Sequence, residues 1–146
     1  VVFVFLALAG VQVRWTWLEL PVLLVLLMAL ALGIALLLSV LYVRFRDIKP
    51  VWQVVTQAMF YATPILYPIE VVRQHYPEAV AYAMCNPLAA INQQIRYAVI
   101  DPTAPSAAAA IGGAGRLAIP LAIIVVTFVA GLVCFVRMAP TIAEEL

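Results

Sequence analysis

Polar and aromatic side chains recur at helical spacing inside an apolar run. They follow one another at intervals of three and four residues, so a helix places them on one face: Gln53, Thr56, Gln57, Phe60 and Tyr61. Amides bond to hydroxyls and aromatic rings pack on C–H surfaces, which suits sugars better than bare ions. Such a stripe either lines a transport pathway or bonds to neighbouring helices for about 0.6 to 2 kcal/mol per contact. Both interpretations stay open, with Gln53, Gln57, Phe60 and Tyr61 as pore-lining candidates.

Charged residues stand at the entry to this run. Arg44, Arg46, Asp47 and Lys49 lie within six positions between two apolar stretches. By the positive-inside tendency, this loop is the best candidate for the cytoplasmic face. It is either a basic anchor beside the membrane or a cytoplasmic entrance formed by Arg44, Arg46 and Asp47.

Prolines and amides mark the other end of the run. Pro64 and Pro68 bend or end a helix because they lack a backbone donor. Pro87 then interrupts residues 79–100, and polar side chains crowd the second half of that range: Asn92, Gln93, Gln94 and Arg96. A continuous lipid-facing helix would leave these groups without partners. We therefore predict two short re-entrant helices within about residues 78–99, followed by a flexible linker over 101–115.

The elements that would position these residues are membrane spans. The chain has 146 residues, of which 67% are hydrophobic and 10% charged, and its mean hydropathy is +1.13. Charge-free stretches of about the length that crosses a bilayer cover residues 22–43, 51–69 and 117–136. Residues 1–13 are apolar but too short, so we expect a truncated span. Within the first long stretch, Ala29 and Gly33 form a small-residue pair of the kind that chance produces in an alanine-rich run.

The predicted fold class is an all-α integral membrane protein. It is a single transmembrane domain over residues 1–146, a multi-span helical bundle with two short re-entrant exofacial helices before the last span. The bilayer lipid is accordingly one expected partner.

The sequence lacks the residues that several classes of function require. The formal net charge of +1 argues against a nucleic-acid partner. His75 is the single histidine, and Cys85 and Cys134 lie far apart without CxxC spacing, so no metal site is expected. The chain contains no HExxH or Walker motif and no paired carboxylates on one helix. We therefore expect no catalytic residues and no enzyme activity in this chain.

Four motifs occur in order along the chain: residues 42–48 (YVRFRDI), 63–68 (TPILYP), 85–88 (CNPL) and 140–146 (PTIAEEL). Together they resemble the C-terminal half of type-2 ABC transporter permeases, in particular the branch that exports polysaccharides such as O-antigen, capsule and teichoic acid. The resemblance implies a six-helix permease that works as a homodimer with two separate ATP-binding subunits. It also implies that this sequence is the C-terminal portion of a longer permease.

The resemblance assigns further expectations to residues and partners. Tyr67, Pro68, Asn86 and Pro87 would bracket exofacial gate helices, and Arg96 joins these candidates because an ionisable residue at membrane depth is by default a functional candidate. Arg96 could equally snorkel outward. ATP and Mg would bind the partner ATPase, with no cofactor on this chain. The substrate would be a glycan or a lipid-linked glycan, and the location a bacterial cytoplasmic membrane, crossed several times.

Three alternatives share much of this pattern. A type-2 ABC exporter of drugs or lipids would have the same architecture. A membrane-embedded transferase could carry its active site in the missing half, and a structural anchoring subunit would need no transport pathway.

Overall fold

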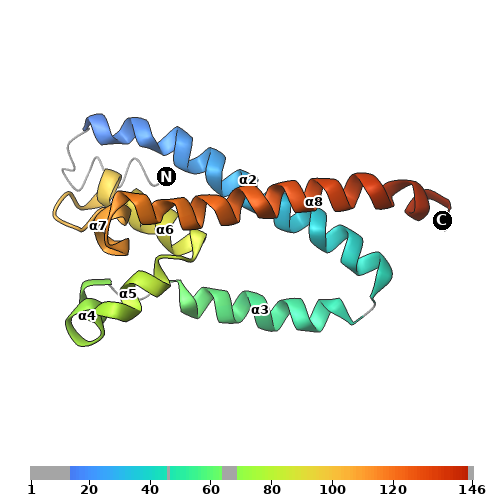
Figure 1. Ribbon diagram of the computed structural model, residues 1–146, viewed down its shortest axis with the longest axis horizontal. Coiled ribbons are helices and arrows are strands. Elements are labelled where there is room, and N and C mark those ends of the chain that lie inside the picture. Colours follow the sequence, from blue (N-terminus) through green and yellow to red (C-terminus); the bar gives the residue numbers. More distant parts are fainter. Residues whose placement is uncertain (1–13, 46, 64–68, 145–146) are drawn as a thin grey trace.

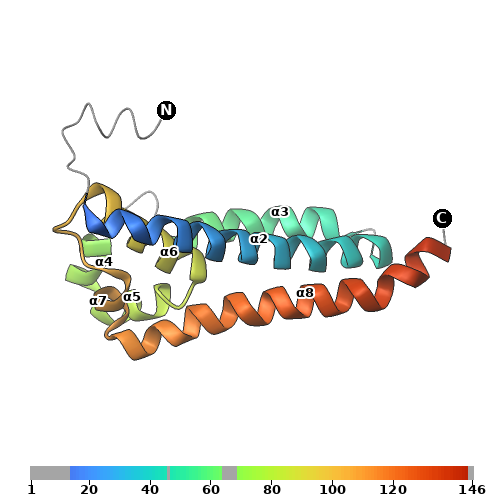
Figure 2. The same cartoon turned by 90° about the horizontal axis from the view of Figure 1, so that it is seen from above.

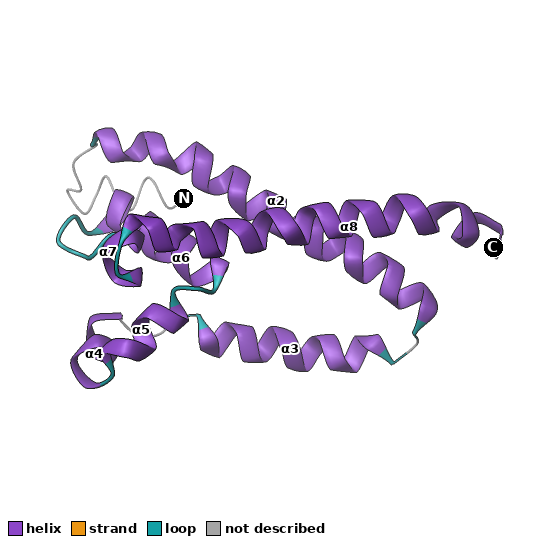
Figure 3. Ribbon diagram, viewed as in Figure 1, coloured by secondary structure: helices purple, strands orange, loops and turns teal. Residues whose placement is uncertain are grey.

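The described part of the chain is built from helices around a crossing of two long ones. The computed structural model describes residues 14–45, 47–63 and 69–144, and within them every regular element is a helix (Figures 1 and 3). Helix α2 (Glu19–Arg44) follows a 3-10 turn, η1 (Trp15–Leu18), and crosses α8 (Ala118–Glu144). Helix α3 (Ile48–Ala62) turns back from the end of α2.

Short helices gather at the end of the molecule where α2 and α8 begin (Figure 2). We call them the short-helix cluster: α4 (Ile69–His75), α5 (Pro77–Ala83), α6 (Pro87–Ile95), the π-helical turn η2 (Arg96–Ile100) and α7 (Ala107–Ile111). A 3-10 turn, η3 (Ala114–Leu117), connects the cluster to α8. The turn between α2 and α3 lies at the opposite end (Figure 2).

The two long helices have the length and composition of membrane spans. Segments Trp15–Arg44 and Ala114–Met138 are each long and apolar enough to cross a bilayer. The ranges 22–43 and 117–136 that the sequence marks fall inside them. Much of their apolar surface is exposed in the structure, including Val25 at 65% and Val126 at 65%. An exposed apolar surface of this kind suits a helix that faces lipid or further helices.

The crossing of α2 and α8 depends on two glycines. A Cβ atom placed on Gly33 would lie 2.7 Å from the Cα of Phe128, and one placed on Gly131 would collide with the carbonyl oxygen of Gly33. The two backbones therefore touch, as small residues allow in helix pairs within membranes. Gly33, whose pairing with Ala29 looked like chance, has a specific packing role opposite α8.

Helix α3 is shorter than the stretch 51–69 proposed from hydropathy. It begins at Ile48, ends at Ala62 and has 15 residues, fewer than a bilayer crossing needs. Thr63 leaves the helix with φ −90° and ψ 127°, because a residue before a proline is pushed out of the α region. The last part of the proposed stretch lies partly outside the described residues, and Ile69 already belongs to α4. The truncated opening run 1–13 also lies outside them.

The expectation of a flexible linker over residues 101–115 was wrong. Helix α7 forms there, and Ile111 is only 1% exposed within an apolar cluster that also contains Ile69, Val80, Met84, Ala89 and Ala110. Ser106 caps the helix by accepting a hydrogen bond from the backbone N–H of Ala109 at 3.3 Å. Gly112 ends it at φ +92°, a left-handed conformation that favours glycine. The alanine-rich stretch therefore forms a capped helix, held in place by the packing of Ile111.

Candidate functional site

The polar stripe predicted on α3 lines an open surface groove, whose lining residues all belong to this one helix. The groove measures about 520 Å³ and is lined by Trp52, Gln53, Thr56, Gln57, Phe60 and Tyr61. Phe60 and Tyr61 meet edge to face, with ring centroids 5.7 Å apart and an interplanar angle of 76°. The Thr56 hydroxyl donates to the carbonyl of Trp52 at 2.9 Å, within the helix. The groove thus presents amide groups beside aromatic rings.

Helix α3 has no buried residue along its length. Tyr61 on the polar face is 60% exposed, and Val55 on the opposite face is 39% exposed. Figure 1 shows α3 standing apart from α8 and from most of α2. Within the described part of the chain, packing buries neither face of α3, so both are accessible to other membrane components.

The proposed entrance residues lie at the turn that leads into α3. Arg44 ends α2 and Asp47 precedes α3, and both are exposed. They border a hollow of about 390 Å³ together with Phe45, Ile48 and Val51. Arg46 lies outside the described residues. Because this turn and the short-helix cluster are at opposite ends of the molecule (Figure 2), α3 and its groove run from one to the other.

Among the gate candidates, Asn86 has a clear structural task. Its Oδ1 accepts a hydrogen bond from the backbone N–H of Leu88 at 3.0 Å and so caps α6. Its Nδ2 donates to Oγ1 of Thr63 at 3.4 Å, and the Thr63 hydroxyl donates to the carbonyl of Met59 at 2.8 Å. Asn86 therefore joins the end of α3 to the start of α6. Pro87 is buried in the first turn of α6, and Tyr67 and Pro68 lie outside the described residues.

The break between α5 and α6 agrees with the two short helices predicted from Pro87, whereas their depth in a membrane stays a prediction.

The polar side chains that follow this break have identifiable partners. The Gln93 side chain is 4% exposed and its Nε2 donates to the carbonyl of Pro105 at 2.7 Å. Satisfied amides of this kind let α6 sit inside the cluster without leaving buried polar groups unpaired.

Gln94 is the residue that joins most of these elements. Its Nε2 donates to Oε2 of Glu19 at 2.6 Å, and its Oε1 accepts from the backbone N–H of Ala107 at 2.9 Å. One amide thus connects the first turn of α2, the end of α6 and the start of α7. In the sequence, Gln94 is only one of several polar residues in the second half of residues 79–100, and nothing distinguishes Glu19. Their contact was not predictable because it joins distant segments.

Arg96 lies at the start of η2, beside a loop that holds Asp101. The Arg96 Nη2 is 3.8 Å from Oδ2 of Asp101, and both side chains are about one-third exposed. The pKa of Asp101 is lowered from its ordinary value of 3.8, mainly because the side chain of Thr103 donates to its carboxylate, at 2.6 Å. The backbone N–H of Thr103 adds a second bond at 2.9 Å. In this position Arg96 helps to order the loop after η2.

A further contact ties η1 to η2. The Thr16 hydroxyl donates to the carbonyl of Ala98 at 2.7 Å, and the Arg14 guanidinium lies 6.0 Å from the centroid of the Tyr97 ring. These contacts hold η1, and with it the start of α2, against η2.

The geometry describes a helical membrane protein with a polar groove on one helix and a cluster of short helices at one end of it. Among the described residues, no group of three His, Cys, Asp or Glu side chains gathers that could hold a metal ion. A comparison with known families matches residues 1–100 to the ABC-2 type transporter family. The chain belongs to this family.

Family membership makes this chain a membrane permease of an ABC transporter. It is a transport component, and the family generally works with an ATP-binding subunit. Comparisons with curated proteins and with solved structures found no match.

Proposed function

We propose that this chain is the permease subunit of an ATP-driven exporter that moves a polysaccharide or a lipid-linked glycan outward across a bacterial cytoplasmic membrane. The observation that carries the proposal is the groove on α3, where the amides of Gln53 and Gln57 stand beside the rings of Phe60 and Tyr61. Sugars offer hydroxyls on their edges and C–H surfaces on their faces. Amides and aromatic rings can bind both without a net charge.

The position of the groove supports a pathway along α3. The charged turn with Arg44 and Asp47 lies at one end of the helix, and the short-helix cluster lies at the other (Figure 2). A substrate that enters beside the charged turn would pass the polar face and leave at the cluster. The contact between Asn86 and Thr63 links the exit end of α3 to α6. A movement of α6 would therefore also displace the exit end of α3.

The proposal includes a second copy of the permease. Helix α3 exposes both its polar face and its apolar face, and lipid suits only the apolar one. We propose that the polar faces of two copies enclose a shared channel, while Val51 and Val55 on the opposite face turn toward lipid or other helices of the protein. ATP and Mg would bind the partner ATPase, whose cycle shifts the permease between closed and open states.

The test is export by the full-length permease with its ATPase in proteoliposomes that contain the glycan. We expect export that needs ATP and stops with a hydrolysis-deficient ATPase. Gln57→Leu combined with Tyr61→Leu should lower export at least several-fold, whereas Val55→Leu on the opposite face should leave it unchanged. Transport of dyes or lipids without transport of the glycan would contradict the proposed glycan export and favour an exporter of drugs or lipids.

A further inference from the structure

A second cavity lies in the short-helix cluster, apart from the groove on α3. It measures about 700 Å³ and opens between α5 and the start of α8. Its apolar part consists of Val80, Ala81, Ala109, Ala110, Ile111 and Ile119. None of its lining residues belongs to the groove on α3, so it is a separate site.

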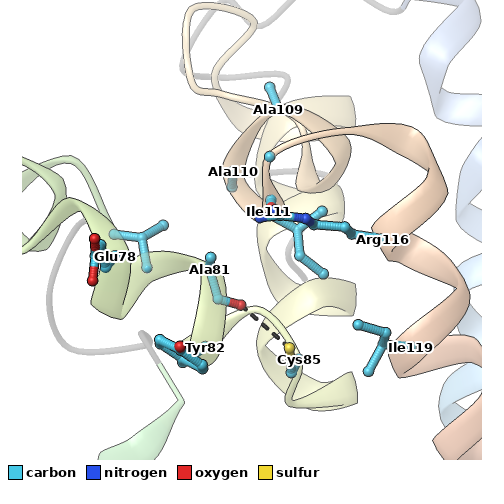
Figure 4. A pocket seen from close by; sticks show the side chains of 11 residues that line it. Glu78, Ala81, Tyr82, Cys85, Ala109, Ala110, Ile111, Arg116 and Ile119 are labelled. Carbon is cyan, nitrogen blue, oxygen red and sulfur yellow. Dashed lines mark hydrogen bonds between the residues drawn. The ribbon is translucent and has the colours of Figure 1, made fainter.

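Two opposite charges border this cavity. Glu78 comes from the first turn of α5, and Arg116 comes from η3, just before α8. Figure 4 shows the two on opposite sides, with the Arg116 side chain reaching over Ile111 toward α5. The Nη1 atom of Arg116 is 3.4 Å from the carbonyl oxygen of Ile111, a long hydrogen bond that occupies one of its five N–H donors. No ion pair joins Glu78 to Arg116, so each charge faces the cavity separately.

The cavity lies beside a membrane span. Arg116 falls within the first residues of the segment Ala114–Met138, which has the length and composition to cross a bilayer. Ile119 follows it and is 45% exposed, and exposed apolar side chains continue along the same face of α8 at Ile123 and Val126. A lipid with its headgroup in the cavity could lay its acyl chains along this surface. Arginine close to the end of a span is also well placed to meet a phosphate at headgroup depth.

We propose that this cavity binds a zwitterionic phospholipid of the phosphatidylethanolamine type from the surrounding leaflet. Arg116 binds the phosphate through its N–H fork, and Glu78 binds the ammonium group. The pair of charges selects a zwitterion, because an anion without an ammonium group meets the Glu78 carboxylate and a plain cation meets the Arg116 guanidinium. This site goes beyond the proposed export function and does not depend on which substrate the permease carries.

The experiment is native mass spectrometry of the purified full-length permease, titrated with phosphatidylethanolamine or phosphatidylglycerol of the same acyl chains. We expect the wild-type protein to prefer phosphatidylethanolamine. Arg116→Gln should weaken binding of both lipids by about two- to fivefold, as expected for an exposed charge contact. Glu78→Gln should weaken only phosphatidylethanolamine, which removes the preference. Arg137→Gln, an exposed arginine at the other end of α8, is the matched control and should leave both affinities unchanged.

Two further experiments test whether the lipid binds in this cavity and whether its acyl chains contribute to binding. Ala81→Trp fills the cavity without changing a charge and should reduce phosphatidylethanolamine binding while the protein keeps its thermal unfolding temperature. Glycerophosphoethanolamine carries the same headgroup without acyl chains and should fail to compete with the lipid at equal concentration. Equal binding of the two lipids to wild type, unchanged binding in Arg116→Gln and Glu78→Gln, or full competition by the soluble headgroup would each overturn the lipid site.

Discussion

Gly131 of α8 lies so close to Gly33 of α2 that a methyl group on it would collide with the Gly33 carbonyl oxygen. The two long helices therefore pack backbone to backbone at their crossing. In a membrane, where apolar side chains gain little by leaving lipid, close packing of this kind is a main source of helix association.

Adding one methyl group at the crossing should separate the helices. Gly131→Ala gains helix propensity but places its Cβ against backbone, which cannot rotate away, and overpacking of this kind costs about 1 to 3 kcal/mol. We expect a lower midpoint of thermal unfolding in detergent, followed by circular dichroism. Gly115→Ala is the matched control, because a Cβ there meets no atom within 4 Å. An unchanged midpoint for Gly131→Ala would contradict the close backbone contact between Gly131 and Gly33.

Loss of the Gln94 amide should loosen the cluster from α2. Gln94→Leu leaves the Glu19 carboxylate and the Ala107 N–H without this partner, at a cost of about 1 to 3 kcal/mol. Asn92→Leu serves as the control, since Asn92 is an exposed amide on the same helix. Hydrogen exchange at residues 107–111 should become faster in Gln94→Leu only. Equal exchange in both variants would mean that Gln94 does not hold α7.

The Asn86 side chain should matter as a cap. Asn86→Ala removes the acceptor for the Leu88 N–H and should destabilise α6 by about 1 kcal/mol, whereas Asn86→Asp keeps that acceptor. The free energy of unfolding in detergent measures both. If Asn86→Asp lowers export while its stability stays that of wild type, the contact of Nδ2 with Thr63 also has a role in the exit.

The loop after η2 should depend on pH in an acidic range. The pKa of Asp101 is lower than its ordinary value of 3.8 in the folded chain, so its charged form stabilises the loop above that pH. This contribution is lost as the pH falls through the folded pKa. Thr103→Val removes the largest cause of the shift and should raise the pKa of Asp101 toward 3.8, as followed by an NMR titration of its carboxyl carbon. A pKa unchanged by Thr103→Val would contradict the assigned cause.

Local stereochemistry made several of these features predictable from sequence. Pro64 forces Thr63 out of the helix, and Pro87 starts a new helix, so the end of α3 and the break before α6 follow from backbone rules. The grouping of Gln53, Gln57 and Tyr61 on one face follows from helical periodicity.

Contacts between distant segments were not predictable in the same way. Nothing near Gly33 indicates that Gly131 will face it, and nothing near Glu19 indicates Gln94. The region of α7 was misjudged because alanine and glycine suggested flexibility, while its order comes from Ile111 packing against residues of α4 and α5. Such contacts depend on the fold as a whole.

The central claim is that the polar face of α3 lines the export pathway, and water accessibility of single cysteines tests it most directly. In a full-length permease carrying Cys85→Ala and Cys134→Ala, Gln57→Cys should react with a membrane-impermeant thiol reagent, faster when the ATPase hydrolyses ATP and more slowly with glycan present. Val55→Cys, on the opposite face, should react slowly in all conditions. Equal reaction at both positions, or a Gln57→Cys rate that neither ATP hydrolysis nor glycan alters, would contradict the account.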